Sequence, residues 1–136
     1  MDTIRLKARA KINLGLDVVR RREDGYHEVR MVMQMLKLYD QIDIEKTQES
    51  GIFVRSNLSF LPTDERNIAY KAAKVMIDQF GLEQGVIIRI EKHIPVAAGM
   101  AGGSSDAAAA LVGINRLFRL GLTERDLMER AVNIGA

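Results

Sequence analysis

The chain has 136 residues, of which 47% are hydrophobic, so it is long and apolar enough to form one domain with a buried core. Its 20 Lys and Arg residues nearly balance 18 Asp and Glu residues, and this charge does not predict a surface that binds nucleic acid. The absence of cysteine excludes disulfides, thiol catalysis and thiolate metal sites. No apolar run approaches the ~18 residues of a membrane helix, and the N-terminus lacks the apolar centre of a signal peptide. We therefore expect a cytoplasmic protein without a nucleic-acid or membrane partner.

The N-terminal half predicts β-strands. Apolar and polar residues alternate over residues 4–18, so Lys11 and Asn13 would point from one face of a strand. The pair Asp24-Gly25 is typical of a turn, and it is followed directly by Tyr26 and His27. Further alternation predicts strands over residues 29–35, 39–46 and 51–56.

The C-terminal half changes to helical spacing. Residues 67–80 place apolar side chains on one broad side, and Gly81 is typical of a helix end. Residues 86–90 are apolar on both faces, which predicts a strand inside a sheet. An alanine-rich helix is expected up to about Phe118, and Thr123 with Asp126 predicts the capping box of a last helix. This order of elements indicates an α+β fold.

The segment between the last strand and the alanine-rich helix has the composition of an anion-binding loop. It contains Gly99, Gly102 and Gly103, followed by Ser104 and Ser105. Glycines let backbone N–H groups approach an anion, and the start of a helix presents unpaired N–H groups and a partial positive charge. The segment lacks the lysine of an ordinary P-loop and the pattern G-x-G-x-x-G of dinucleotide-binding folds. A glycine turn whose serine only caps the helix is the alternative.

Three stretches of the sequence carry a family resemblance. Residues 95–109, P-V-A-A-G-M-A-G-G-S-S-D-A-A-A, resemble the signature P-x-x-x-G-L-[AG]-[GS]-S-S of the GHMP kinases, which include galactokinase and the homoserine, mevalonate and phosphomevalonate kinases. Residues 10–18 (A-K-I-N-L-G-L-D-V), 24–29 (D-G-Y-H-E-V) and 64–73 (D-E-R-N-I-A-Y-K-A-A) are similar to those members that act in the non-mevalonate (MEP) isoprenoid pathway. Met100 replaces the usual leucine and keeps its size and polarity.

The resemblance implies a ribosomal protein S5 domain 2-like fold and a kinase that uses ATP with Mg²⁺. The implied reaction phosphorylates the 2-hydroxyl of 4-diphosphocytidyl-2-C-methyl-D-erythritol. Lys11 would be the catalytic residue near the accepting hydroxyl, and Asn13, Tyr26 and His27 would bind the substrate. The implied ATP-binding residues are Asn67, Pro95, Val96, Ala97, Ala98, Gly99, Met100, Ala101, Gly102, Gly103, Ser104 and Ser105.

The resemblance also implies that residues 1–136 are only the N-terminal, ATP-binding domain. The sequence ends at Ala136, where the family continues with Asp-Val-Pro, whose aspartate is the catalytic base, and then with a C-terminal domain. We therefore expect the chain to be inactive alone and to self-associate through the exposed domain interface.

Other interpretations stay open at this point. The substrate could be homoserine, mevalonate or a sugar, although Tyr26 and His27 favour a pyrimidine ring, or the chain could be a non-catalytic binding module. Lys11 and Asn13 could be exposed strand residues, and Asn67 could be a helix N-cap.

Overall fold

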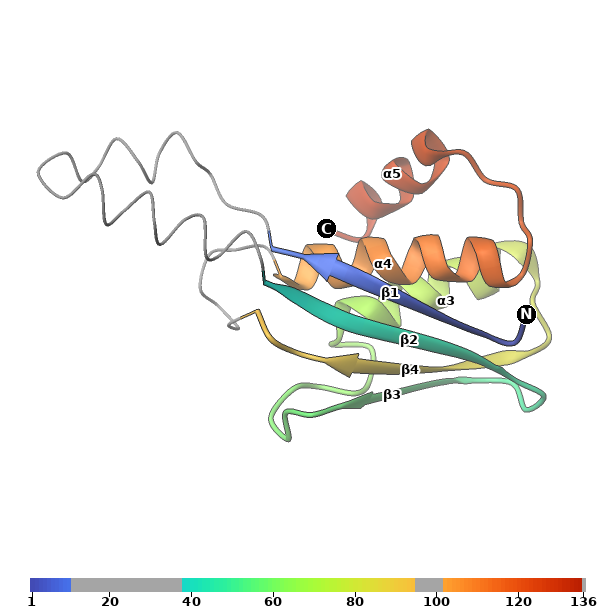
Figure 1. The fold of residues 1–136 in the computed structure, drawn as a ribbon. Helices are drawn as coiled ribbons and strands as arrows, with labels where there is room; N and C mark the ends of the chain where they lie inside the picture. The colour runs from blue at the N-terminus through green and yellow to red at the C-terminus, as the bar shows by residue number, and fades with distance from the viewer. Residues whose placement is uncertain (11–37, 95–101, 136) are drawn as a thin grey trace, which may run out of the picture.

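The computed structural model describes residues 1–10, 38–94 and 102–135, with side chains from residue 105 onward in the last range. Within these ranges, strands and helices follow one another in the predicted order (Figure 1). The strands are β1 (Thr3–Arg9), β2 (Tyr39–Thr47), β3 (Ile52–Ser56) and β4 (Gly85–Glu91), and the helices are α3 (Ile68–Phe80), α4 (Gly102–Leu117) and α5 (Glu124–Asn133). The α+β class is confirmed, whereas the strands expected at 12–18 and 29–35 lie outside the described residues.

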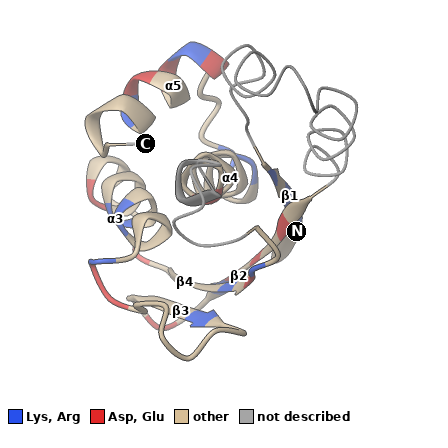
Figure 2. Ribbon diagram, turned by 90° about the vertical axis from the view of Figure 1, so that its left-hand side faces the viewer, with Lys and Arg blue, Asp and Glu red and all other residues tan. Residues whose placement is uncertain are grey.

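The four strands form one mixed sheet in the order β1-β2-β4-β3. β2 pairs antiparallel with both β1 and β4, whereas β3 and β4 are parallel and are connected through α3. Figure 1 shows the helices over one face of the sheet, and Figure 2 shows α5 on the side of α3 and α4 that faces away from the strands. Because β3 and β4 run in the same direction, α3 starts at the end of the sheet where both strands end.

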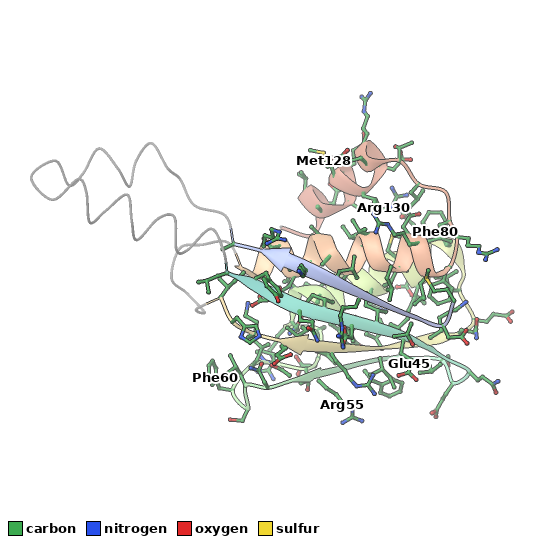
Figure 3. All side chains as sticks on the ribbon, viewed as in Figure 1. Glu45, Arg55, Phe60, Phe80, Met128 and Arg130 are labelled. Carbon is green, nitrogen blue, oxygen red and sulfur yellow. The ribbon has the colours of Figure 1, made fainter. Side chains whose placement is uncertain are left out.

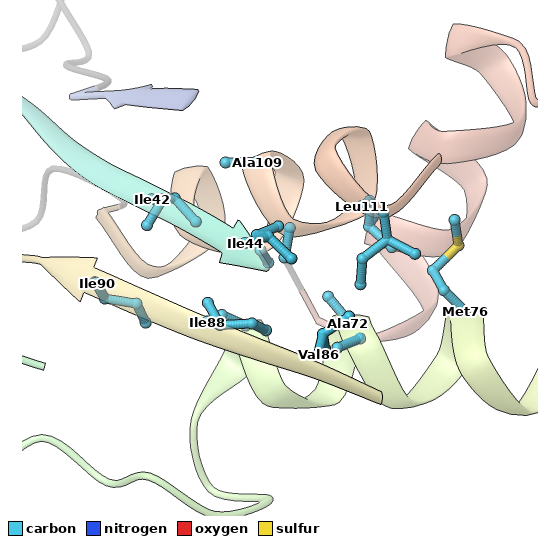
Figure 4. Packing of buried hydrophobic residues seen from close by; sticks show 14 of the residues in the cluster. Ile42, Ile44, Ala72, Met76, Val86, Ile88, Ile90, Ala109 and Leu111 are labelled. Atoms are coloured by element: carbon cyan, nitrogen blue, oxygen red, sulfur yellow. The ribbon is translucent and has the colours of Figure 1, made fainter. Parts of the chain in front are cut away.

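The core lies between the sheet and the helices. Strand alternation directs Ile42 and Ile44 of β2 to this side, where they stand in register with Ile90 and Ile88 of β4 and are fully or almost fully buried (Figure 4). The helices meet them with small side chains, which let the helical backbones approach the sheet closely. The buried alanines of α3 and α4 are Ala69, Ala72, Ala73, Ala107, Ala109 and Ala110.

The helix boundaries follow from local sequence signals. The side chain of Asn67 accepts hydrogen bonds from the backbone N–H groups of Ala69 and Tyr70, and Gly81 ends α3 in the left-handed conformation with φ of 57°. Thr123 and Asp126 form the predicted capping box of α5. No helix among the described residues is long and apolar enough to span a membrane.

The opposite face of the sheet is exposed and charged. Arg5 pairs with Asp43 at 2.8 Å and Arg89 pairs with Glu45 at 3.0 Å, in both cases across neighbouring strands. Figure 3 shows Glu45 and Arg55 on this side, away from the helices. The two faces of the sheet therefore differ sharply in polarity, and the apolar face holds the core.

Candidate functional site

The residues that flank the predicted site segments meet at one end of the sheet. Ala10 and Leu38 flank residues 11–37, and the N–H of Ala10 donates to the carbonyl of Leu38 at 3.1 Å. Ile94, which precedes residues 95–101, packs with both of them in a small buried apolar cluster. On the other side of that segment, Ser105 donates its hydroxyl hydrogen to the carbonyl oxygen of Arg9 at 2.7 Å. The chain therefore reaches both predicted site segments from one place in the fold.

A groove with a volume of about 680 Å³ runs along β1 and α4 and reaches this place. The residues that line it include Ala10, Ser105 and four cationic residues: Arg5, Lys7, Arg9 and Arg116. Because side chains alternate along a strand, Arg5, Lys7 and Arg9 extend from β1 toward the exposed face of the sheet rather than toward α4. Lys7 and Arg9 also lie over the ring of Tyr39, at 5.0 and 5.8 Å from its centroid. The groove is thus open to solvent and adjacent to the start of α4, and the cationic residues of β1 flank it.

A buried cluster of three charged side chains lies beside the start of α4. The ammonium group of Lys92 is 2.6 Å from Asp40 Oδ2 and 3.2 Å from Asp106 Oδ2, and no more than 5% of any of the three side chains is exposed. Asp40 belongs to β2, Lys92 follows β4 directly, and Asp106 lies in α4. The second oxygen of Asp106, Oδ1, is buried without a hydrogen-bond partner among the described residues.

The pKa values of these groups shift in directions that keep the cluster close to neutral. Burial raises the pKa of Asp106 to about 8, with a further rise from Asp40 that outweighs the opposing effect of Lys92. Burial also acts to raise the pKa of Asp40, but hydrogen bonds from Asp106, Lys92 and the backbone of Ile94 and His93 lower it. For Lys92, burial lowers the pKa, and the two carboxyl groups more than compensate and raise it. Near pH 7 the cluster therefore consists of an ammonium, a carboxylate and a protonated carboxyl group.

The structure describes few of the residues predicted for the site. Asn67 is the N-cap of α3; its amide also donates to the carbonyl of Pro62 at 2.9 Å, so both ends of its side chain contact the protein itself. Ser105 is buried and its hydroxyl hydrogen is directed to Arg9. Gly102, Gly103 and Ser104 form the first turn of α4. The remaining predicted residues lie outside the described residues: Lys11, Asn13, Tyr26, His27, Pro95, Val96, Ala97, Ala98, Gly99, Met100 and Ala101.

The buried cluster was not predicted from the sequence, although the strand alternation contained a signal for it. Asp40 shares its strand phase with Ile42 and Ile44, and Lys92 continues the phase of Ile88 and Ile90. In a strand, residues two apart point to the same face, so both charged side chains must face the core. A charged residue in an inward phase needs a charged partner. What the pattern does not give is the identity of that partner.

Comparison with known proteins gives the family. The model of the GHMP kinases N terminal domain matches residues 67–136, which is just over half of the chain. The chain belongs to the GHMP kinase family. A 4-diphosphocytidyl-2-C-methyl-D-erythritol kinase from Lachnospira eligens is 57% identical over all of this chain and 47% of that protein, and one from Clostridioides difficile is 56% identical over all of this chain and 46% of that protein. The chain thus spans about half the length of the curated relatives that it matches.

Solved structures of GHMP kinases share the fold. A crystal structure of 4-(cytidine 5'-diphospho)-2C-methyl-D-erythritol kinase superposes with a TM-score of 0.64 and 30% identity, over 98% of this chain and 46% of that one. The homoserine kinase from Cytophaga hutchinsonii superposes with a TM-score of 0.66 over 72% of this chain and 32% of that one. At 22% identity this likeness shows a shared fold alone.

The described part of this GHMP kinase chain contains no cluster of metal-ligating side chains. Among residues 1–10, 38–94 and 102–135, no group of three His, Asp or Glu side chains could hold a metal ion. The buried carboxyl groups of Asp40 and Asp106 face the ammonium of Lys92, which is not an environment for a divalent cation. Mg²⁺ remains a prediction from the family resemblance.

Proposed function

We propose that this chain forms the ATP-binding part of a kinase that phosphorylates the 2-hydroxyl of 4-diphosphocytidyl-2-C-methyl-D-erythritol. The curated relatives at 53–57% identity that cover nearly all of the chain bear this enzyme's name. The observation in the structure that supports the proposal most is the bond between Ser105 and Arg9. It joins the chain that leads to Lys11 to the helix that follows the glycine-rich segment.

In this proposal the glycine-rich segment and the start of α4 bind the triphosphate of ATP. Backbone N–H groups at residues 99–105 donate to the phosphate oxygens, and the helix dipole favours the negative charge. The cationic residues of β1 beside the groove attract the polyanion from solution, because opposite charges increase the rate of encounter. No P-loop lysine is needed in this arrangement.

The proposed phosphoryl transfer uses a base that accepts the hydroxyl proton and a lysine that stabilises the developing negative charge. The 2-hydroxyl oxygen attacks the γ-phosphorus, the bond between that phosphorus and ADP breaks, and the hydroxyl proton passes to a base that the family resemblance places beyond residue 136. Lys11 stabilises the negative charge that develops on the attacking oxygen and the phosphoryl group. Asn13 orients the acceptor, while Tyr26 stacks on the cytosine ring and His27 hydrogen-bonds to its edge.

The proposal is tested with a two-domain protein. Residues 1–136 are joined to the part of the Lachnospira eligens relative that follows its matching region, and the isolated chain serves as the comparison. We expect ATP-dependent phosphorylation of the cytidyl substrate by the fusion, with the phosphate located on the 2-hydroxyl by NMR, and little or no turnover by the isolated chain. Preferential phosphorylation of homoserine, mevalonate or a sugar by the fusion would contradict the substrate assignment.

A lysine substitution tests the chemistry within the same fusion. Removal of one charge-stabilising donor typically lowers kcat by about 10²–10³-fold, and we expect Lys11→Ala to do the same. Lys74→Ala is the matched control, because the ammonium of Lys74 is exposed on α3 and pairs only with Asp78 at 3.2 Å among the described residues. Equal activity of the two variants would remove Lys11 from the proposed mechanism.

A further inference from the structure

The buried cluster of Lys92, Asp40 and Asp106 connects the two ends of the glycine-rich segment. Lys92 lies two residues before Ile94, the last described residue ahead of that segment, and Asp106 lies in the second turn of the helix that follows it. The ammonium of Lys92 contacts Asp106 directly at 3.2 Å and contacts Asp40 of β2 at 2.6 Å. The chain before the segment and the helix after it are therefore joined through one side chain and fixed to the sheet.

The entry to the segment is held by backbone contacts as well. Asp40 Oδ1 accepts hydrogen bonds from the N–H groups of His93 at 2.7 Å and Ile94 at 2.9 Å. The side chain of Asn57 accepts from the N–H of Lys92 at 2.8 Å and donates to its carbonyl oxygen at 3.2 Å. Three consecutive residues thus have fixed backbone positions, although they follow the end of β4.

The exit from the segment is held by side chains of α4. Ser105 donates to the carbonyl of Arg9, and Asp106 reaches Lys92, so neighbouring residues of the helix contact β1 and the cluster. Stability alone does not require charged groups here, since well-packed apolar residues of similar volume are often as stabilising as a buried ion pair. Hydrogen bonds between charged groups have a preferred geometry, which apolar contacts lack. The cluster therefore fixes the orientation of the chain before the glycine-rich segment and of the helix after it.

We propose that Lys92, Asp40 and Asp106 are positioning residues for the nucleotide, because they fix Ile94 and the start of α4, whose backbone N–H groups bind the phosphates in the proposed function. The inference rests on the proposed ATP-binding function and names residues that act through the backbone rather than by contact with the ligand. When the ends are released, a smaller fraction of molecules is competent to bind. If that fraction falls to about a tenth, the apparent Kd for ATP rises about tenfold.

Asp106→Ala is the variant that tests the proposal most directly. It releases α4 from the cluster and leaves the ion pair of Lys92 and Asp40 in place, so the entry side remains held. Asp106→Asn serves as the rescue variant, because a neutral amide has the size and hydrogen-bonding capacity of the protonated carboxyl group. Ile114→Val is the stability control, since Ile114 is buried in the same helix and lies about two turns beyond Asp106.

Three measurements on these variants separate positioning from stability. The first is the midpoint of thermal unfolding, the second is the Kd for Mg·ATP by calorimetry in the chain and the fusion, and the third is hydrogen exchange of the amides of residues 93–94 and 106–108. We expect Asp106→Ala to raise the Kd about tenfold and to speed exchange at these amides, with the KM for the acceptor unchanged. Asp106→Asn should restore both, and Ile114→Val should alter neither.

The outcomes distinguish this inference from the proposed function. Equal Kd and exchange in Asp106→Ala and Ile114→Val, at matched loss of thermal stability, would overturn the positioning role. Absence of Mg·ATP binding by both wild-type proteins would overturn the nucleotide-binding function itself. In that case the exchange comparison still decides whether the cluster holds the two chain ends, because it needs no ligand.

Discussion

At the residue scale, the protonation of Asp106 makes the free energy of unfolding depend on pH. Its pKa rises from the ordinary 3.8 to about 8 on folding. Between these values the folded state keeps a proton that the unfolded state loses, so Asp106 lowers the free energy of unfolding as the pH rises, by at most about 1.4 kcal/mol per pH unit. Asp40 and Lys92 do not titrate in this window, since the pKa of Asp40 is lowered and that of Lys92 is raised.

Asp106→Asn should therefore gain stability relative to the wild type as the pH is raised from 5 to 8. Asparagine does not titrate, so the variant lacks this loss of stability. Urea unfolding of both proteins at four or five pH values measures the difference. Parallel pH profiles would show that Asp106 carries its charge throughout this range and that the protonated form does not exist near pH 7.

Asn67 has two interpretations, as the N-cap of α3 and as a residue that contacts adenine, and two substitutions separate them. Loss of an N-cap costs about 0.5–2 kcal/mol, so Asn67→Ala should lower the free energy of unfolding by this amount, whereas Asn67→Ser keeps an oxygen that can accept from the N–H groups of Ala69 and Tyr70. If Asn67 also contacts adenine, both variants weaken ATP binding although only the alanine variant loses the cap. Wild-type ATP affinity in Asn67→Ser would leave Asn67 with the capping role alone.

At the scale of elements, two glycines mark how closely the strands and helices approach. A Cβ added to Gly85, at the start of β4, would lie 2.3 and 2.5 Å from the carbonyl oxygens of Gly51 and Glu49, which are backbone atoms. At Gly113 in α4 the closest atoms are the methyl ends of Ile44 and Leu6, at 2.6 and 2.9 Å. These side chains can rotate away, and alanine also favours the helix by about 1 kcal/mol.

We expect Gly85→Ala to be much more destabilising than Gly113→Ala. Overpacking typically costs about 1–3 kcal/mol, and the cost at Gly85 should reach or exceed the upper limit because the backbone turn before β3 has to move. At Gly113 the gain in helix propensity offsets most of the cost. Chemical denaturation of the two variants tests the order, and a reversed order would mean that α4 cannot shift on the sheet.

The elements themselves were predictable because their signals are local. Alternation placed Ile42 and Ile44 on the buried face, and Thr123 with Asp126 marked the start of α5; the structure confirms both. The order of strands in the sheet and the partners of Asp40 depend on contacts between distant parts of the chain, since Lys92 follows Asp40 by 52 positions. Such contacts leave no periodic signal in a single sequence.

At the scale of the whole molecule, the candidate site was predictable by its motifs but not by its surroundings. The family resemblance identified the glycine-rich segment and Lys11, whose positions lie outside the described residues. The convergence of their flanking residues, Ala10 and Ile94 among them, emerged only from the fold. Chemical roles can be transferred with a motif, whereas the groups that hold the motif in place are set by tertiary packing.

We expect the isolated chain to self-associate through the outer side of α5. Arg130 anchors this helix to α3, since its guanidinium lies 5.4 Å from the ring centroid of Phe80 and donates to Gln79 at 2.7 Å. Met128 and Val132, one helical turn apart, are 61% and 71% exposed and line a shallow groove of about 470 Å³. An exposed apolar pair on a fixed helix favours association with another apolar surface.

We expect the isolated chain to show concentration-dependent dimer formation in sedimentation equilibrium, and Met128→Lys with Val132→Lys to abolish it because two like charges would face a second copy. Phe60→Ser is the matched control, since Phe60 is 70% exposed but lies in the connection before α3. Dimers that persist in the lysine variant and vanish in Phe60→Ser would place the contact at the other end of the molecule. A monomer at every concentration would show that the apolar area on α5 is too small to drive association, and that its exposure alone does not mark an interface.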